Sequence, residues 1–158
     1  LIQFQRFNWA NMECIGNFYP MEKFNEPNTL LLSKYLKHVL PTIKIAYPRI
    51  LPDGLSMDFF EETEEFIENK WGIIEPLSIQ KIEIQQMDAI LIPMLGFDTY
   101  GQRIGFGKGY YDRYFENKTN DCLRIGISYF EPIPKLEDTH QFDVPLTHCI
   151  TPSKIYEF

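Results

Sequence analysis

Residues 87–95, MDAILIPML, form a nearly unbroken run of apolar side chains. A strand with one face in solvent alternates apolar and polar residues, whereas a strand covered on both faces does not. The run therefore predicts a strand that is buried on both faces. Such strands are typical of a parallel sheet that lies between two layers of helices.

Helical patterns occur on both sides of this run. Apolar residues at positions 1, 4, 7, 9 and 12 indicate the end of a helix within residues 1–12. Asn28 is a candidate N-cap for a helix within residues 26–40. A short acidic helical stretch is expected over residues 61–68, and a further helix over residues 110–116.

Strand patterns alternate with these helices. Residues 77–87 are ambiguous, but five other segments favour strands: 14–19, 43–48, 54–60, 122–130 and 148–152. Alternating strands and helices predict an α/β fold in three layers, with a mostly parallel sheet and flanking helices.

Length and composition limit the class of protein. The chain has 158 residues, enough for one domain, which we expect to span residues 1–158 with a truncated N-terminal helix. The net charge of −7 argues against a general nucleic-acid binder and against binding to an anionic membrane.

No apolar run reaches 18 residues, so no membrane span is expected. We expect the protein to be cytoplasmic and monomeric. Cys14, Cys122 and Cys149 are widely spaced, so disulfides and a structural zinc site are not expected.

The most distinctive segment is RIGFGKGYYDRYF, residues 103–115. It follows the buried strand, and ligand pockets in open α/β sheets lie at the carboxyl ends of strands. Gly105, Gly107 and Gly109 let a ligand oxygen approach the backbone, and the predicted helix start adds free N–H groups. Lys108 can meet a phosphate as a point charge. On these residues alone, a flexible turn with a solvated lysine remains an equal alternative.

Residues beside the glycines fit the same chemistry. Arg103 can add a forked contact to phosphate, and Asp112 can hold magnesium beside it. Tyr111 has the spacing of a core-facing helix residue, whereas Tyr110 is freer to line a site. The spacing of the Walker A loop and of the dinucleotide fingerprint is absent.

In context, IPMLGFDTYGQRIGFGKGYYDRYF (92–115) resembles the signature of the 5-formyltetrahydrofolate cyclo-ligase family, also called 5,10-methenyltetrahydrofolate synthetases. Four other segments resemble family elements in the same order: FYPMEKFNEPNT (18–29), IAYPRI (45–50), WGIIEP (71–76) and HQFDVPLTHCIT (140–151). The resemblance implies a fold similar to that of phosphosugar isomerases and CoA-transferase-like proteins. It also implies that ATP phosphorylates the formyl oxygen of 5-formyltetrahydrofolate, after which ring closure releases phosphate.

The resemblance also implies roles by position, with reduced folate and ATP as small-molecule partners and Mg²⁺ as the metal. Lys108 and Arg103 are the implied catalytic residues. The implied ATP-binding residues are Arg103, Ile104, Gly105, Phe106, Gly107, Lys108, Gly109, Tyr110 and Tyr111. The implied substrate-binding residues are Tyr19, Met21, Glu26, Trp71, Phe106, Gly107, Lys108, Gly109 and Tyr110. The implied magnesium ligands are Asp112 and Asp143.

Simpler roles remain open for several of these residues. Glu26 can cap the helix near Asn28, Trp71 can belong to the core, and Asp143 can be a surface carboxylate. The sequence also departs from the family pattern. Phe106 stands where many members have arginine, Thr147 stands where a second aspartate is common, and the N-terminal lysine and arginine have no match.

Two other functions remain open for the chain. A phosphosugar isomerase-like enzyme would use the glycine loop for a sugar phosphate and would need no ATP. A folate- or nucleotide-binding protein without turnover would bind ligand but release no ADP. The departures from the family pattern give weight to the binding protein, whereas the Gly-Tyr-Tyr-Asp ending and the flanking elements argue against the isomerase.

Overall fold

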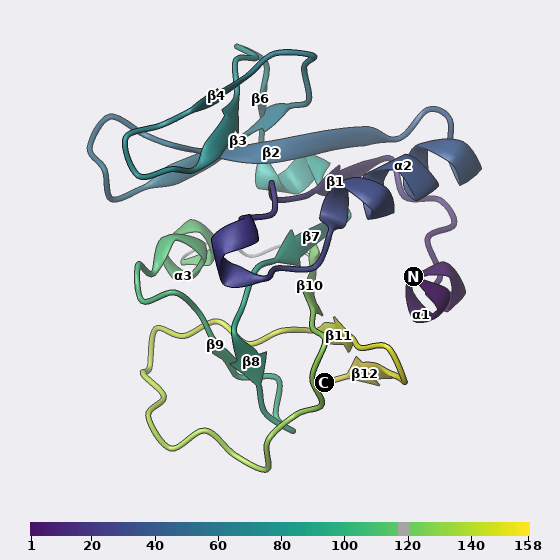
Figure 1. Cartoon of the computed structure of the whole chain (residues 1–158), viewed down its shortest axis with the longest axis vertical. Coiled ribbons are helices and arrows are strands. Elements are labelled where there is room, and N and C mark those ends of the chain that lie inside the picture. The colour runs from purple at the N-terminus through teal and green to yellow at the C-terminus, as the bar shows by residue number, and fades with distance from the viewer. Residues whose placement is uncertain (117–120) are drawn as a thin grey trace.

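The computed structural model describes residues 1–116 and 121–158 (Figure 1). Within these residues an eight-stranded sheet has the order β12-β11-β10-β7-β1-β2-β3-β6. The five strands from β11 to β2 are parallel to one another, and β12, β3 and β6 pair antiparallel at the two sides. The strands are β1 (Cys14–Gly16), β2 (Lys44–Ile50), β3 (Met57–Glu61), β6 (Lys81–Ile82), β7 (Ala89–Ile92), β10 (Leu123–Ile127), β11 (His148–Ile150) and β12 (Ile155–Glu157).

Strand β7 is buried on both faces, as its apolar run predicts. Ala89 and Leu91 belong to one core, and Ile90 and Ile92 belong to the other. The first core also contains side chains of α1 (Ile2–Arg6) and α2 (Thr29–Val39), whereas the second contains Tyr114 and Phe115 of α3 (Tyr110–Phe115). Helices therefore cover both faces of the sheet, and the predicted α/β layering is confirmed.

Helix α2 begins where its cap predicts. The Asn28 side-chain oxygen accepts a hydrogen bond from the Leu31 amide at 3.3 Å, which satisfies one of the free N–H groups of the first turn. Leu32 and Leu36, four residues apart, are both buried against the sheet. The helix is three residues shorter than the predicted range at its start and one shorter at its end.

The predicted acidic helix over residues 61–68 is wrong. Here β4 (Phe66–Glu68) pairs antiparallel with β5 (Ile74–Pro76) in a separate hairpin. Phe66 packs its ring against Tyr47, with 5.3 Å between ring centroids, and this contact comes from a distant part of the chain. Glu64, Glu65 and Glu68 are exposed, so their acidity reflects a solvated hairpin.

Other elements are shorter than predicted. Helical structure within residues 1–12 is limited to α1, and the strand expected over 14–19 ends at Gly16. The ambiguous stretch 77–87 contains β6 and the short 3-10 helix η2 (Ile84–Gln86), and β12 is an addition to the predicted strands. No helix in the described residues is long and apolar enough to cross a membrane.

The carboxyl ends of the parallel strands, and the segments that follow them, form the candidate site. Because β1, β2, β7 and β10 are parallel, their carboxyl ends lie at one edge of the sheet. The segment after β1 contains a 3-10 helix, η1 (Glu22–Phe24), and the segment after β7 contains the hairpin of β8 (Gly96–Phe97) and β9 (Arg103–Ile104). Both segments face the β4–β5 hairpin across a cavity.

Candidate active site

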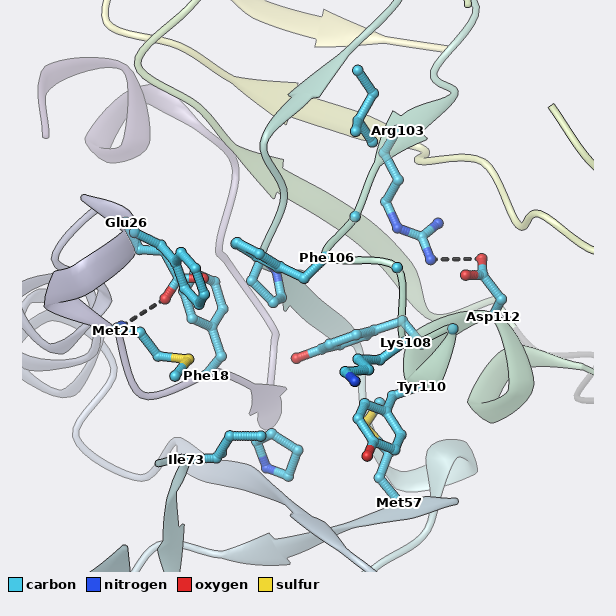
Figure 2. Close-up of a pocket in the computed structure, with 18 of the residues that line it drawn as sticks. Phe18, Met21, Glu26, Met57, Ile73, Arg103, Phe106, Lys108, Tyr110 and Asp112 are labelled. Carbon is cyan, nitrogen blue, oxygen red and sulfur yellow. Dashed lines mark hydrogen bonds and ion pairs between the residues drawn. The ribbon is translucent and has the colours of Figure 1, made fainter. Parts of the chain in front are cut away.

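A cavity of about 1010 Å³ opens at the carboxyl edge of the sheet. Figure 2 shows Phe18, Met21 and Glu26 on one side of it and Arg103 and Asp112 on the other. All the candidate residues line this one cavity: Tyr19, Met21, Glu26, Trp71, Arg103, Ile104, Gly105, Phe106, Gly107, Lys108, Gly109, Tyr110, Tyr111, Asp112 and Asp143. The fold thus brings together segments that are separated by up to 124 positions, from Tyr19 to Asp143.

The glycine loop follows β9 and presents bare backbone to the cavity. Gly107 and Gly109 have φ values of 76° and 64°, which favour glycine over other residues. A Cβ atom built on Gly107 would meet no atom within 4 Å, so the space beside this backbone is open. The Arg113 guanidinium donates to the Lys108 carbonyl at 2.7 Å and to the Leu55 carbonyl at 2.7 Å, which holds the end of the loop.

Lys108 and Tyr110 face the cavity from the end of this loop (Figure 2). Lys108 is exposed, and its side chain extends toward the centre of the cavity. The Tyr110 hydroxyl donates to the Gly54 carbonyl at 3.1 Å, which ties α3 to the turn between β2 and β3. The cavity therefore contains a solvated ammonium beside open backbone, an arrangement suited to an anion.

Arg103 is held in an ion pair. Its Nη2 donates to Oδ1 of Asp112 at 2.7 Å, and its Nη1 donates to the Val144 carbonyl. The Val144 amide donates to the same Asp112 oxygen at 3.1 Å. The Arg103 side chain is only 6% exposed, and it lines the cavity while both of its Nη atoms donate to the protein.

Asp112 and Asp143 lie between the main cavity and a second cavity of about 400 Å³. Asp143 accepts a hydrogen bond from the His140 amide on Oδ2, at 2.8 Å. Among the described residues, each carboxylate accepts hydrogen bonds on one oxygen, which leaves its other oxygen for a ligand. The Thr147 hydroxyl, by contrast, accepts from the Arg124 amide and donates to the Arg124 carbonyl, and Thr147 lines neither of these two cavities.

Glu26 supplies a carboxylate at the opposite end. Its Oε2 accepts a hydrogen bond from the Met21 amide at 2.6 Å. Burial raises the pKa of Glu26, and the Met21 bond opposes this effect only partly. Asn17 fixes the start of this segment, because its buried side chain donates to Ser33 at 2.6 Å and accepts from the Phe18 amide at 2.8 Å.

Trp71 lies at the rim and is 40% exposed, which excludes the core alternative for this residue. It extends from the turn of the β4–β5 hairpin. In this turn the Asn69 side-chain oxygen accepts a hydrogen bond from the Trp71 backbone amide at 2.9 Å. Asn69 in turn donates to Glu75 at 2.8 Å, and Glu75 accepts the Ile50 amide at 2.8 Å. This chain of hydrogen bonds anchors the hairpin and its tryptophan to β2.

Phe24 and Glu75 are among the cavity residues that sequence reasoning missed. Phe24 contacts Phe106 across the cavity, with ring centroids 4.6 Å apart. Glu75 is buried in the cavity wall. Glu75 lies within the WGIIEP segment, whose resemblance could have pointed to it, whereas nothing in the sequence pairs Phe24 with Phe106.

Comparison with known proteins agrees with this architecture. The structure of the 5,10-methenyltetrahydrofolate synthetase of Aquifex aeolicus aligns with a TM-score of 0.77 at 21% identity, over 98% of this chain and 78% of that one. The synthetase of Mycoplasma pneumoniae aligns with a TM-score of 0.69 at 29% identity, over 93% and 78%. The likeness to the Aquifex aeolicus structure shows that this chain has the same fold.

Sequence comparison identifies the family. The 5-formyltetrahydrofolate cyclo-ligase of Escherichia coli K12 is 30% identical over 102 residues, which are 63% of this chain and 56% of that protein. The Mycoplasma pneumoniae cyclo-ligase is 36% identical over 87 residues, which are 55% and 43%. The chain thus matches about half the length of these curated relatives. The model of the 5-formyltetrahydrofolate cyclo-ligase family matches residues 7–152, so the chain belongs to that family.

Proposed function

We propose that the protein cyclises 5-formyltetrahydrofolate to 5,10-methenyltetrahydrofolate, with magnesium-ATP converted to ADP and phosphate. The observation that carries this proposal is that Glu26 and the glycine loop line one cavity of about 1010 Å³. Pockets for single small ligands usually measure about 300–1,000 Å³. The cavity is therefore large enough for a folate head and a triphosphate to meet inside it.

The reaction needs alignment more than it needs a protein nucleophile. The formyl oxygen attacks the γ-phosphorus, and the bond from that phosphorus to ADP breaks. The neighbouring folate amine then attacks the formyl carbon, loses its proton, and expels phosphate as the C–O bond breaks. Positioning of the two substrates and neutralisation of phosphate charge are the main contributions that such a site can make.

Lys108 is the group we assign to charge neutralisation. Its solvated ammonium and the open backbone of the loop lie on the same wall, so a triphosphate can contact both. We assign phosphate contacts to the segment from Arg103 to Tyr111, with Tyr111 contributing its main chain. Arg103 contributes mainly positive potential, because its donors already contact Asp112 and Val144.

Asp112 and Asp143 are suited to magnesium. Each has one carboxylate oxygen that accepts no hydrogen bond from the described residues, and both line the cavity beside the loop. No group of three metal-ligating side chains gathers in the described residues. That fits magnesium, which takes one or two protein carboxylates and completes its shell with phosphate and water. Bound there, the ion would neutralise phosphate charge.

The folate head fits the opposite end. A carboxylate such as Glu26 can accept paired N–H bonds from a pterin, and its hydrogen bond from Met21 fixes its orientation. Tyr19, Met21, Trp71 and Phe106 surround this end with the flat and soft surfaces that a ring system contacts. The formyl group would then point toward Lys108 and Tyr110.

The test is an ATP-dependent assay of the methenyl product by its near-ultraviolet absorbance. Lys108→Ala and Asp112→Ala should each lower the rate at least about a hundredfold, as expected when a charge that stabilises the transition state is lost. Lys34→Ala is the matched control, because it removes an exposed lysine from α2 and does not line the cavity. Folate binding without product would leave a binding protein, and a sugar phosphate as the ligand would favour the isomerase alternative.

A further inference from the structure

Tyr111 has a buried hydroxyl with no hydrogen-bond partner in the part of the chain that the structure describes. Its ring packs edge-on toward Phe59 of β3, with 6.5 Å between centroids, and the side chain also lines the cavity. Within the described residues, its oxygen is the only fully buried side-chain nitrogen or oxygen that lacks a hydrogen bond. Native proteins nearly always satisfy such groups, so this atom calls for a functional explanation.

Three other tyrosines in the protein have partners for their hydroxyls. Tyr47 is buried and lies 3.4 Å from the Ser33 hydroxyl, and Tyr110 donates to the Gly54 carbonyl. Tyr156 donates to Glu131 at the surface. The lack of a partner is therefore a property of the position of Tyr111, at the cavity wall.

The Tyr111 hydroxyl can donate a hydrogen bond, because a phenol is protonated at physiological pH. Glu26, an acceptor, and Tyr111, a donor, line the same cavity.

We infer that the Tyr111 hydroxyl donates to the ring carbonyl of the bound pterin, beside Glu26, which accepts the N–H groups of the same ring edge. This inference rests on the proposed function. A pterin presents an exocyclic amine, a ring N–H and a carbonyl on adjacent atoms. A carboxylate matches the two donors and a phenol O–H matches the acceptor. The ligand would satisfy the Tyr111 hydroxyl, which is buried and has no hydrogen-bond partner among the described residues.

The inference predicts an unusual pair of effects for Tyr111→Phe. Removing a satisfied buried hydroxyl lowers stability, but removing an unpaired one does not. The variant should therefore melt at the same temperature as the wild type or higher. Its affinity for 5-formyltetrahydrofolate, measured by titration calorimetry without ATP, should be about tenfold weaker. The KM for ATP should not change.

Tyr156→Phe is the matched control, because it removes a paired phenol far from the cavity lining. It should bind folate normally. A lower melting temperature with unchanged folate affinity in Tyr111→Phe would show a structural role and overturn the inference. A raised KM for ATP alone would assign the hydroxyl to the nucleotide and also overturn it.

The wild type separates this inference from the proposed function. If the wild type binds no folate, the proposed function fails and the inference fails with it. If the wild type binds folate and turns it over while Tyr111→Phe binds equally well, only the inference fails.

Discussion

The Arg103 guanidinium and the Asp112 carboxylate form an ion pair of 2.7 Å at the wall of the cavity. Both residues also contact Val144, whose carbonyl accepts from Arg103 and whose amide donates to Asp112. Three segments therefore meet at this pair: the start of the glycine loop, the first turn of α3, and the stretch around residue 144. The pair fixes Asp112 where we propose that magnesium binds.

Arg103→Met should destabilise the fold, because it leaves Asp112 without its charged partner. We expect a loss of about 2 kcal/mol in the free energy of unfolding, below the 3–5 kcal/mol of fully buried pairs because Asp112 is 26% exposed. Urea unfolding of Arg103→Met, Asp112→Asn and the double variant measures the coupling. Strictly additive losses would mean that the two side chains do not stabilise one another.

Asn17→Ala should loosen the segment that contains Glu26. Asn17 is 1% exposed, and its loss leaves the Phe18 amide without this acceptor and removes the shorter of two contacts of the Ser33 hydroxyl, which keeps Tyr47 at 3.4 Å. We expect a loss of about 2–3 kcal/mol in urea unfolding, together with weaker folate binding. Asn28→Ala is the control, because it removes only the cap of α2 and should cost about 1 kcal/mol with normal binding. Equal losses in the two variants would contradict this role for Asn17.

Local signals were the predictable part of this fold. The Asn28 cap and the apolar run of β7 depend on residues adjacent in the sequence, and both predictions are confirmed. The β4–β5 hairpin was missed because Phe66 packs against Tyr47, a contact that no local pattern encodes.

The site, like the fold, has features that the sequence predicts and features that it does not. The glycine loop is contiguous, so its members could be named from the sequence. The resemblance supplied Glu26, Trp71 and Asp143, which lie far apart along the chain. The Arg103–Asp112 pairing and the unpaired hydroxyl of Tyr111 depend on how three segments meet, and they could be found only in three dimensions.

Glu26→Gln should change how stability depends on pH. Because burial raises the pKa of Glu26, the folded protein binds a proton more tightly than the unfolded chain does. Wild-type stability therefore falls as pH rises from the unfolded pKa, about 4.3, through the folded value. The variant lacks this fall, so it should be more stable than the wild type at neutral pH and lose this advantage in acid. Urea unfolding across this range is the measurement.

Glu26→Gln should also bind folate weakly, because its side-chain NH₂ group is a donor and cannot accept a hydrogen bond from the N–H groups of the pterin ring. A stability difference that does not vary with pH would show that Glu26 titrates alike in the folded and unfolded chains.

Phe106 and Phe24 should hold the cavity closed over its ligand. Their rings are 4.6 Å apart, a contact of about 0.5–1.5 kcal/mol, and it joins the glycine loop to the segment after β1. Phe106→Ala and Phe24→Ala should each release 5-formyltetrahydrofolate a few times faster in stopped-flow experiments. The double variant should be no faster than either single one, because the pair acts together.

Phe106→Arg separates this contact from charge. It removes the ring pair but adds a cation to the glycine loop, where phosphate is proposed to bind. We expect faster folate release, as for Phe106→Ala, together with a lower KM for ATP, which Phe106→Ala should not show. Phe106→Tyr keeps the aromatic contact and is the control for release. If Phe106→Arg released folate at the wild-type rate, the Phe24–Phe106 contact would have no part in retaining the ligand.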